Sequence, residues 1–328
     1  MASPPTELYA PALSLVLSTA VLLVLLRARG LALDHPNERS LHQRPVPRTG
    51  GLAIVLGCLS AIAVFLPESR ALCALAVALA LVSAMDDWKG LSVLVRLAAH
   101  FAAAAALVFQ LGSSISVLDA SLLVLGTVWL TNLYNFMDGS DGLAGGMAVI
   151  GFGAYAACAW LAGYPSLASL SASVAVAAVP FLMVNFHPAR IFMGDAGSVT
   201  LGFLAAGLGI LGWRQGAWSV WTPLVVFSPF IVDATVTLAR RAMSGRRVWH
   251  AHREHFYQKL VRMGFGHRNT ALMEYGVMLA AAAGAVAMLF LSESAQIILC
   301  AAWTAVLCIA GGFVDLAWNR HSRTGSGA

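Results

Sequence analysis

The stretch "VLDASLLVLGTVWLTNLYNFMDGSDGLAGGMAVIGFGAYAACAWL", residues 117–161, contains two long apolar runs joined by a short acidic, glycine-rich connection. Each run has about 20 residues, the length that an α-helix needs to cross the ~30 Å hydrocarbon layer of a membrane. The connection carries Asp138 and Asp141. The pattern therefore predicts two membrane-spanning helices whose shared end presents carboxylates.

Apolar runs with short polar connections continue along all 328 residues, of which 59% are hydrophobic and 11% are charged. Soluble domains have roughly 25% charged residues, so this composition excludes an ordinary soluble globule. All five cysteines lie inside apolar runs, and no CxxC pair occurs, which argues against a disulfide framework or a thiolate metal site. We predict an all-α polytopic membrane protein with a single integral membrane domain over residues 1–328. About eleven spanning helices are expected, near residues 8–26, 50–67, 71–85, 93–111, 117–135, 143–161, 166–184, 196–213, 218–239, 270–291 and 294–318.

The positions of Lys and Arg predict the orientation of these helices. No basic residue precedes the first span, whereas Arg27 and Arg29 follow it, which places the N-terminus outside, in the periplasm. With this orientation, all of the 20 Lys and Arg residues except Arg70 and Arg214 lie on the cytoplasmic side, as does the C-terminus. The expected cytoplasmic segments besides the tail are 27–49, 86–96, 136–142, 185–198 and 240–269.

Polar oxygen-bearing residues are concentrated in two of these segments. Asp86 and Asp87 are adjacent at a helix end. They form either a solvated helix boundary or a carboxylate pair that needs a cation or a basic partner nearby. Asn135, Asp138 and Asp141 recur at every third position. A helix continuing for one further turn would place these three side chains near one face, and the alternative is an acidic turn.

A further carboxylate, Asp195, lies in a Gly-Asp-Ala-Gly-Ser turn that opens the next expected helix. The free N–H groups of a helix N-terminus suit a phosphate, although Asp195 is equally suited to capping the helix. An acidic pocket that also holds a diphosphate needs Mg²⁺, bound through one or two carboxylates and the phosphate oxygens.

The segment 240–269 holds eight Lys or Arg and four His residues. Part of this charge is the excess that cytoplasmic loops carry, which attracts anionic lipid heads. The group of His250, His252 and His255 around Arg253 is denser than topology requires. Zinc would lack Cys or carboxylate partners at a suitable spacing, so binding of an anion with Arg253 forked onto a phosphate fits better. Together, these segments predict magnesium-dependent chemistry on a diphosphate at the cytoplasmic face.

Five motifs then occur in an order that resembles the polyprenyl-phosphate N-acetylhexosamine-1-phosphate transferase superfamily. They are "DHPNERSLHQRPVPRTGG" (34–51), "MDDWKGL", "NFMDGSDGLAGG", "ARIFMGDAGS" and "HAHREHFYQKL". The resemblance covers residues ~30–260. It implies that a lipid phosphate, expected to be undecaprenyl phosphate, attacks the β-phosphorus of a UDP-N-acetylaminosugar. UMP leaves, and a polyprenyl-diphospho-sugar remains in a bacterial inner membrane. The expected ion is Mg²⁺ with Mn²⁺ as a substitute. A homodimer is expected, and a nucleic-acid partner is not.

The resemblance also implies roles for residues at matching motif positions. Asp195 would be the main metal ligand. Asp86 and Asp87 would either hold the metal as well or deprotonate and orient the lipid phosphate, which Arg96 would meet. The expected substrate-binding residues are Asn135, Asp138, Asp141 and Asn185 in the nucleotide region, Phe192 stacked on uracil, and His252, Arg253 and His255 at the sugar-phosphate end.

The sequence departs from the peptidoglycan branch of this superfamily at two places. The form "HAHREH" replaces the three-histidine run of that branch, and Lys89 falls one place before the position of its lysine. The first departure argues against a muramyl-pentapeptide substrate and resembles the O-antigen-initiating branch. That branch uses smaller sugars such as N-acetylglucosamine, N-acetylfucosamine or N-acetylquinovosamine.

Other membrane proteins fit the sequence less well. CDP-alcohol phosphotransferases need a signature that Gly145 and Gly146 interrupt. A transporter of a lipid-linked or anionic solute would predict paired charges near the membrane centre and an inverted repeat, but only Asp233 is a candidate. We expect Asp233 to pair with Arg240 or a loop residue or to form a wall of the site, and we expect His100 to be a packing residue.

Overall fold

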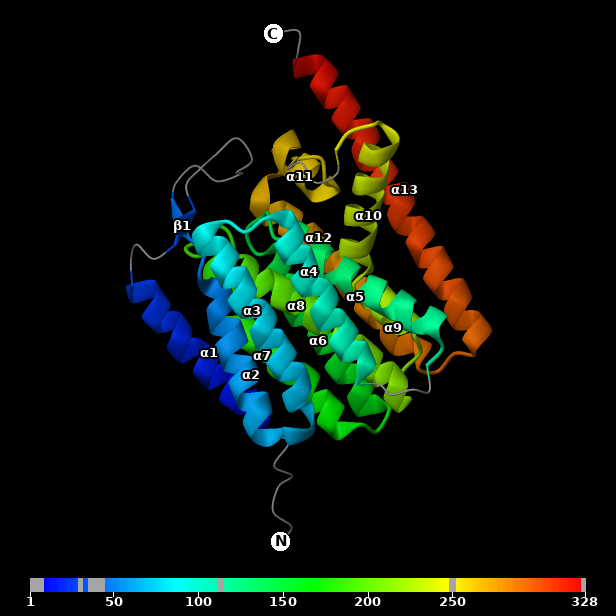
Figure 1. Cartoon of the computed structure of the whole chain (residues 1–328). Coiled ribbons are helices and arrows are strands. Elements are labelled where there is room, and N and C mark those ends of the chain that lie inside the picture. Colours follow the sequence, from blue (N-terminus) through cyan, green and yellow to red (C-terminus); the bar gives the residue numbers. More distant parts are fainter. Residues whose placement is uncertain (1–8, 29–31, 35–44, 111–114, 248–251, 326–328) are drawn as a thin grey trace.

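The computed structural model describes residues 9–28, 32–34, 45–110, 115–247 and 252–325, and these are almost entirely helical (Figure 1). The predicted all-α membrane architecture is confirmed. Segments 35–44 and 248–251 of the motifs, including His250, lie outside the described residues. The helices are α1 (Tyr9–Arg27), α2 (Gly50–Phe65), α3 (Arg70–Lys89), α4 (Val93–Phe109), α5 (Val117–Phe136), α6 (Leu143–Leu161), α7 (Pro165–Asn185), α8 (Asp195–Gln215), α9 (Trp221–Val226), α10 (Ser228–Met243), α11 (Phe256–Leu260), α12 (Gly266–Met288) and α13 (Glu293–Gly325).

Short elements complete the described chain. The 3₁₀ turn η2 (Pro67–Ser69) precedes α3, and the π-helical turn η3 (Val261–Phe265) separates α11 from α12. Two-residue strands, β1 (Leu33–Asp34) and β2 (Val46–Pro47), pair antiparallel just before α2.

Helix α8 forms the centre of the bundle (Figure 1). It packs against α2, α3 and α5, and every residue from Ala196 to Gly209 is buried. Helices α1, α2, α6 and α7 pack together as one group, and α4 lies against α3 and α5. Helix α8 is rich in Gly and Ala. These small residues let neighbouring backbones approach closely, which matters in a membrane because lipid supplies no hydrophobic driving force between helices.

Eight helices in the described part of the chain are long and apolar enough to cross a membrane, and α2 and α4 are shorter apolar helices. A membrane requires this architecture, because each helix satisfies its own backbone N–H and C=O groups. The count of eleven spans and their orientation stay predictions.

The expected span 218–239 is wrong as a continuous helix. The structure breaks it at Phe227 into α9 and α10. Pro229 lies in the first turn of α10, and the residue before a proline is disfavoured in helical conformation. The break redirects α10 toward the end of the bundle where α11 lies (Figure 1).

Helix α13 stands at the edge of the bundle and extends past its end (Figure 1). It packs on α10 and α11. Asp315 of α13 forms ion pairs with Arg240 and with Lys259, the latter at 2.6 Å. Arg240 is therefore paired with Asp315 and not, as one alternative expected, with Asp233.

The orientation can be tested with single cysteines in a variant lacking the five native ones. Ser292, between α12 and α13, and Ser244, after α10, are both exposed. We expect a membrane-impermeant maleimide to label Ser292→Cys in intact cells and Ser244→Cys only after permeabilisation, because the positive-inside rule places them on opposite sides. Labelling of Ser244→Cys in intact cells would contradict this orientation.

Candidate active site

Carboxylates from different helices meet at one end of the bundle, where α3 and α5 end and α4 and α8 begin. Arg96 of α4 joins two of them, with its Nη1 3.0 Å from Asp86 Oδ2 and 3.9 Å from Asp195 Oδ2. The other oxygen of Asp86 accepts a hydrogen bond of 2.6 Å from the backbone N–H of Leu91. Asp86 and Asp195, which are 109 positions apart in the sequence, therefore lie in the same site.

Asp87 faces the start of α8. The first backbone N–H groups of that helix, at Asp195 and Ala196, interact with the Asp87 carboxylate. Arg48 approaches Asp87 twice, since its Nη2 donates to the Asp87 carbonyl oxygen at 2.6 Å and its Nη1 lies 3.5 Å from Oδ1. The N-terminus of α8, which favours negative charge, is thus occupied by Asp87.

Arg48 is a site residue that sequence reasoning did not single out, although it lies in the first motif. Backbone hydrogen bonds fix its position: Phe192 N–H donates to Pro47 O at 2.7 Å, and Gly50 N–H donates to Phe192 O at 2.8 Å. Gly194 has φ +75°, and a Cβ there would collide with the Arg48 carbonyl oxygen. The Gly in the GDAGS turn therefore allows the two segments to lie together.

Asn135 and Asp138 extend the site from the end of α5. Asn135 accepts a hydrogen bond of 2.8 Å from Ser198 Oγ, and its side chain also bonds Asp195. Asp138 lies in the connection after α5, and burial raises its pKa well above the usual range, with further contributions from the carboxylates of Asp195 and Asp87. Such a group of interacting carboxylates is stabilised by a cation.

Asp141 is held by a different set of contacts. Its Oδ2 is 2.6 Å from His187 Nδ1 and accepts the N–H of Ala189 at 3.1 Å. His267 of α12 stacks on His187, with ring centroids 5.4 Å apart, and its Nδ1 is 2.8 Å from Ser140 Oγ. Helix α5 ends at Phe136, so of the two alternatives the acidic turn is the one that forms, and Asn135, Asp138 and Asp141 do not share one helical face.

Asn185 and Phe192 hold the 185–195 segment in place. Asn185 accepts the N–H of Gly142 at 2.9 Å and donates to Ile191 O at 2.9 Å, so both ends of its amide are used. The Phe192 side chain is half-buried, and its backbone bonds Pro47 and Gly50. The structure therefore places both residues between the glycine-rich connection and the GDAGS turn.

Glycines in the connection after α5 and at the start of α6 leave space for two tyrosine side chains. Tyr257 donates to Phe136 O at 3.3 Å, and Tyr275 donates to Gly142 O at 2.7 Å. A Cβ on Gly139 would collide with the Tyr257 hydroxyl, and one on Gly146 with the Tyr275 ring. The glycines are thus required where α11 and α12 cover the acidic connection.

The basic segment is anchored by Asp233 of α10. Its Oδ1 is 3.0 Å from His255 Nδ1 and accepts the N–H of Phe256 at 3.0 Å, and its Oδ2 accepts the N–H of Tyr257 at 3.2 Å. Of the alternatives considered for Asp233, the structure shows pairing with a loop residue, and it leaves His255 with only 3% of its surface exposed.

The other two residues expected at the sugar-phosphate end flank this anchor. Burial, and then the neighbouring His255 and Arg241, lower the pKa of His252 to about 4, so this imidazole is neutral at pH 7. Arg253 keeps its charge and accepts a hydrogen bond of 3.1 Å on its carbonyl oxygen from Arg262. Arg253 therefore brings a guanidinium to this end of the site.

A cavity of about 120 Å³ opens beside the carboxylates. Its wall includes Asp86, Arg96, Asn135 and Asp195, together with His100. The Nδ1 of His100 is buried and has no hydrogen-bond partner in the described residues. The His100 side chain also bonds Asn132, so it packs in this wall with one partner from the bundle, and its buried Nδ1 is left for a water or a ligand.

The donor set fits a magnesium ion that a substrate completes. No three His, Cys, Asp or Glu side chains in the described ranges are arranged as a full protein-made metal site. Mg²⁺ does not need one, since it binds through one or two carboxylates plus waters and substrate phosphates. The acidic group offers only hard oxygen ligands, which suit Mg²⁺ or Mn²⁺.

The chain belongs to the polyprenyl-phosphate N-acetylhexosamine-1-phosphate transferases. The sequence pattern of Glycosyl transferase family 4 matches residues 69–213, a range that contains Asp86, Asp138 and Asp195. The matched range thus includes the segments that the structure brings together at one end of the bundle.

Individual relatives match well beyond this range. A probable undecaprenyl-phosphate N-acetylglucosaminyl 1-phosphate transferase of Bacillus subtilis is 32% identical over 267 residues, covering 74% of each chain. A decaprenyl-phosphate N-acetylglucosaminephosphotransferase of Mycobacterium tuberculosis is 32% identical over 318 residues, covering 81% of this chain and 78% of its own. An undecaprenyl-phosphate alpha-N-acetylglucosaminyl 1-phosphate transferase of Escherichia coli K12 is 29% identical over 266 residues, covering 73% and 72%.

Removing Asp233 is expected to destabilise the protein strongly. Asp233→Ala leaves His255 and the N–H groups of Phe256 and Tyr257 buried without their acceptor. Breaking a buried pair costs about 3 kcal/mol or more of unfolding free energy. Chemical denaturation in mild detergent measures it, with the exposed Glu293→Ala as the control, expected to stay within about 0.5 kcal/mol. Equal stability of the two variants would show that Asp233 does not anchor this segment.

Proposed function

We propose that this protein transfers an N-acetylaminosugar 1-phosphate from a UDP-sugar to undecaprenyl phosphate, releasing UMP, at the cytoplasmic face of a bacterial inner membrane. The observation that carries the proposal is the convergence of Asp86, Asp87, Asp138 and Asp195 on one end of the bundle. A diphosphate brings its own negative charge, so such a site can receive it only through a divalent cation.

Asp87 and Asp195 are the side chains best placed to hold that ion. They lie together at the start of α8. Both oxygens of Asp86 are engaged, by the Leu91 N–H and by Arg96, so Asp86 orients Arg96 in this proposal. When bound, Mg²⁺, or Mn²⁺ in its place, would neutralise the charge that develops on the diphosphate.

The acceptor phosphate fits the cavity beside Arg96. The guanidinium offers a charged donor, and His100 lines the same wall. The second pKa of a phosphate monoester is near 6, so at pH 7 the lipid phosphate is already largely a dianion and a strong protein base is not required. The residues at this wall therefore bind and orient the nucleophile.

The donor nucleotide is placed along the connection between α5 and α6. Asn135 and Asp138 adjoin the carboxylate group, and Phe192 offers a half-buried ring for stacking on uracil. Asp141 and Asn185 act by holding the loops around this pocket, because their polar atoms are used in hydrogen bonds within the protein.

At the sugar-phosphate end, we assign contact with the substrate to Arg253 and His252. His255 positions their segment through Asp233. We propose N-acetylglucosamine as the first sugar to test, since the named relatives transfer it. N-acetylfucosamine and N-acetylquinovosamine follow from the O-antigen-type form "HREHFYQKL". The product would start a cell-surface polysaccharide such as O-antigen, and a homodimer remains expected.

The proposal is tested with purified protein, Mg²⁺, undecaprenyl phosphate and a panel of UDP-N-acetylaminosugars. We expect UMP release with at least one sugar, restored by Mg²⁺ or Mn²⁺ after chelation. UDP-N-acetylmuramyl-pentapeptide is included and should give no UMP. If no sugar in the panel releases UMP from protein that elutes as a folded species, the proposed reaction is wrong.

Asp195→Asn is expected to lower turnover by roughly 100-fold or more, because loss of a ligand exceeds the 10- to 100-fold cost of losing an outer-shell partner. Asp119→Asn, at the opposite end of α5, is the matched control and should retain activity. Both variants should elute as the wild type does in size-exclusion chromatography. Substantial activity of Asp195→Asn would remove this residue as the main metal ligand.

A further inference from the structure

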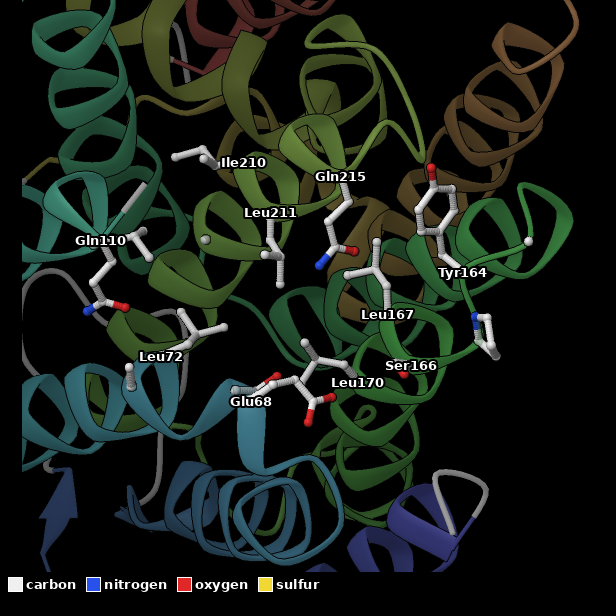
Figure 2. Close-up of a pocket in the computed structure, with 16 residues that line it drawn as sticks. Glu68, Leu72, Gln110, Tyr164, Ser166, Leu167, Leu170, Ile210, Leu211 and Gln215 are labelled. Atoms are coloured by element: carbon white, nitrogen blue, oxygen red, sulfur yellow. The ribbon is translucent and has the colours of Figure 1, made fainter. Parts of the chain in front are cut away.

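A second and larger cavity lies at the opposite end of the bundle from the carboxylates. Figure 2 shows the residues that line it. Its volume is about 600 Å³, within the roughly 300–1,000 Å³ typical of ligand sites. It lies between the start of α3, the ends of α4 and α8, and the connection from α6 to α7. Helix α8 has 21 residues, so at 1.5 Å per residue its two ends are roughly 30 Å apart, a membrane thickness.

The floor of the cavity is apolar, and its rim is polar. Leu72, Leu107, Leu167 and Leu170 are buried leucines of the floor. The floor stays open because Gly207 of α8 has no side chain, and a Cβ there would lie 2.9 Å from Leu72 Cδ1. An apolar base next to polar groups at the end of a membrane span suits an amphiphile.

Three side chains at the rim have hydrogen-bonding capacity that the protein does not use. Glu68, Gln110 and Gln215 line the cavity and make no side-chain hydrogen bond or ion pair within the described residues. Figure 2 shows the Glu68 carboxylate and the Gln215 amide on opposite sides of the opening, with leucines between them. The two carboxamides can donate to phosphate or ester oxygens, whereas the carboxylate can only accept.

The charge of the residues that line the cavity indicates which class of amphiphile it would bind. Glu68 is the one charged residue among the described residues that line the cavity, and none of the lining residues is basic. A polyanionic diphosphate lipid would meet no cationic partner there, whereas a primary ammonium would meet a carboxylate. We propose that this cavity binds a phospholipid with a primary ammonium headgroup, the ammonium on Glu68 and the phosphate-glycerol region near Gln110 and Gln215.

Native mass spectrometry of the full chain in detergent tests this assignment with phosphatidylethanolamine, phosphatidylcholine and phosphatidylglycerol of identical acyl chains. We expect phosphatidylethanolamine to bind most tightly. Glu68→Gln should weaken it by roughly tenfold or more, as loss of a charge-assisted hydrogen bond does, and should leave phosphatidylglycerol unchanged. Glu293→Gln, an exposed carboxylate outside the cavity, is the matched control and should bind as the wild type does.

Two further measurements distinguish lipid binding in this cavity from binding elsewhere on the protein and from binding of a soluble amine. Gly207→Leu should reduce phosphatidylethanolamine binding by filling the floor, whereas Gly153→Leu, where a side chain meets open space, should not. Equal binding of the three lipids, or equal effects of Glu68→Gln and Glu293→Gln, would overturn the proposal. Displacement by millimolar ethanolamine or spermidine would show that the ligand is a soluble amine and would overturn the lipid assignment. UMP release does not enter this readout, so its outcome is independent of the proposed reaction.

Discussion

The candidate site depends on four carboxyl groups that the fold holds close together. It also depends on the positive charges that offset their mutual repulsion. Arg96 lies between Asp86 and Asp195, and Arg48 lies against Asp87. Asp138 also interacts with Asp87 and Asp195, so four carboxyl groups share these two arginines, and burial together with this repulsion raises the pKa of Asp138. In the proposed function, a divalent cation bound there would relieve the repulsion that remains.

Several hydrogen bonds hold in place the segments that cover this acidic group. Asp233 fixes the start of α11, Tyr257 and Tyr275 pack on glycines of the connection after α5, and Asn185 fastens that connection to the segment before α8. Each of these bonds links segments that are far apart in sequence. The site is thus built from short polar contacts at helix ends, while the long apolar helices between the two ends give it a rigid base.

Apolar run lengths predicted the helices well, because a membrane allows few alternatives to a helix. They did not predict the break at Phe227, where Pro229 ends the regular pattern without ending the apolar run. The spacing of Asn135, Asp138 and Asp141 misled for a related reason: periodicity has meaning only while a helix continues, and α5 stops at Phe136.

Among site residues, aspartates in dense motifs were found from the sequence because carboxylates are conspicuous in an apolar chain. Arg48 and His100 were not, since their roles depend on partners from other helices. The one usable signal for Arg48 was its place inside a motif. For His100 it was a polar side chain within an apolar span, which is expensive without a partner.

Whether Asp87 and Asp195 hold one divalent cation can be measured by titrating purified protein with Mn²⁺ and following free Mn²⁺ by electron paramagnetic resonance. We expect one bound Mn²⁺ per chain, tighter binding when UDP is added, and loss of that binding in Asp87→Asn and Asp195→Asn. Mn²⁺ binding that is absent with UDP present, or that both variants keep unchanged, would contradict this expectation.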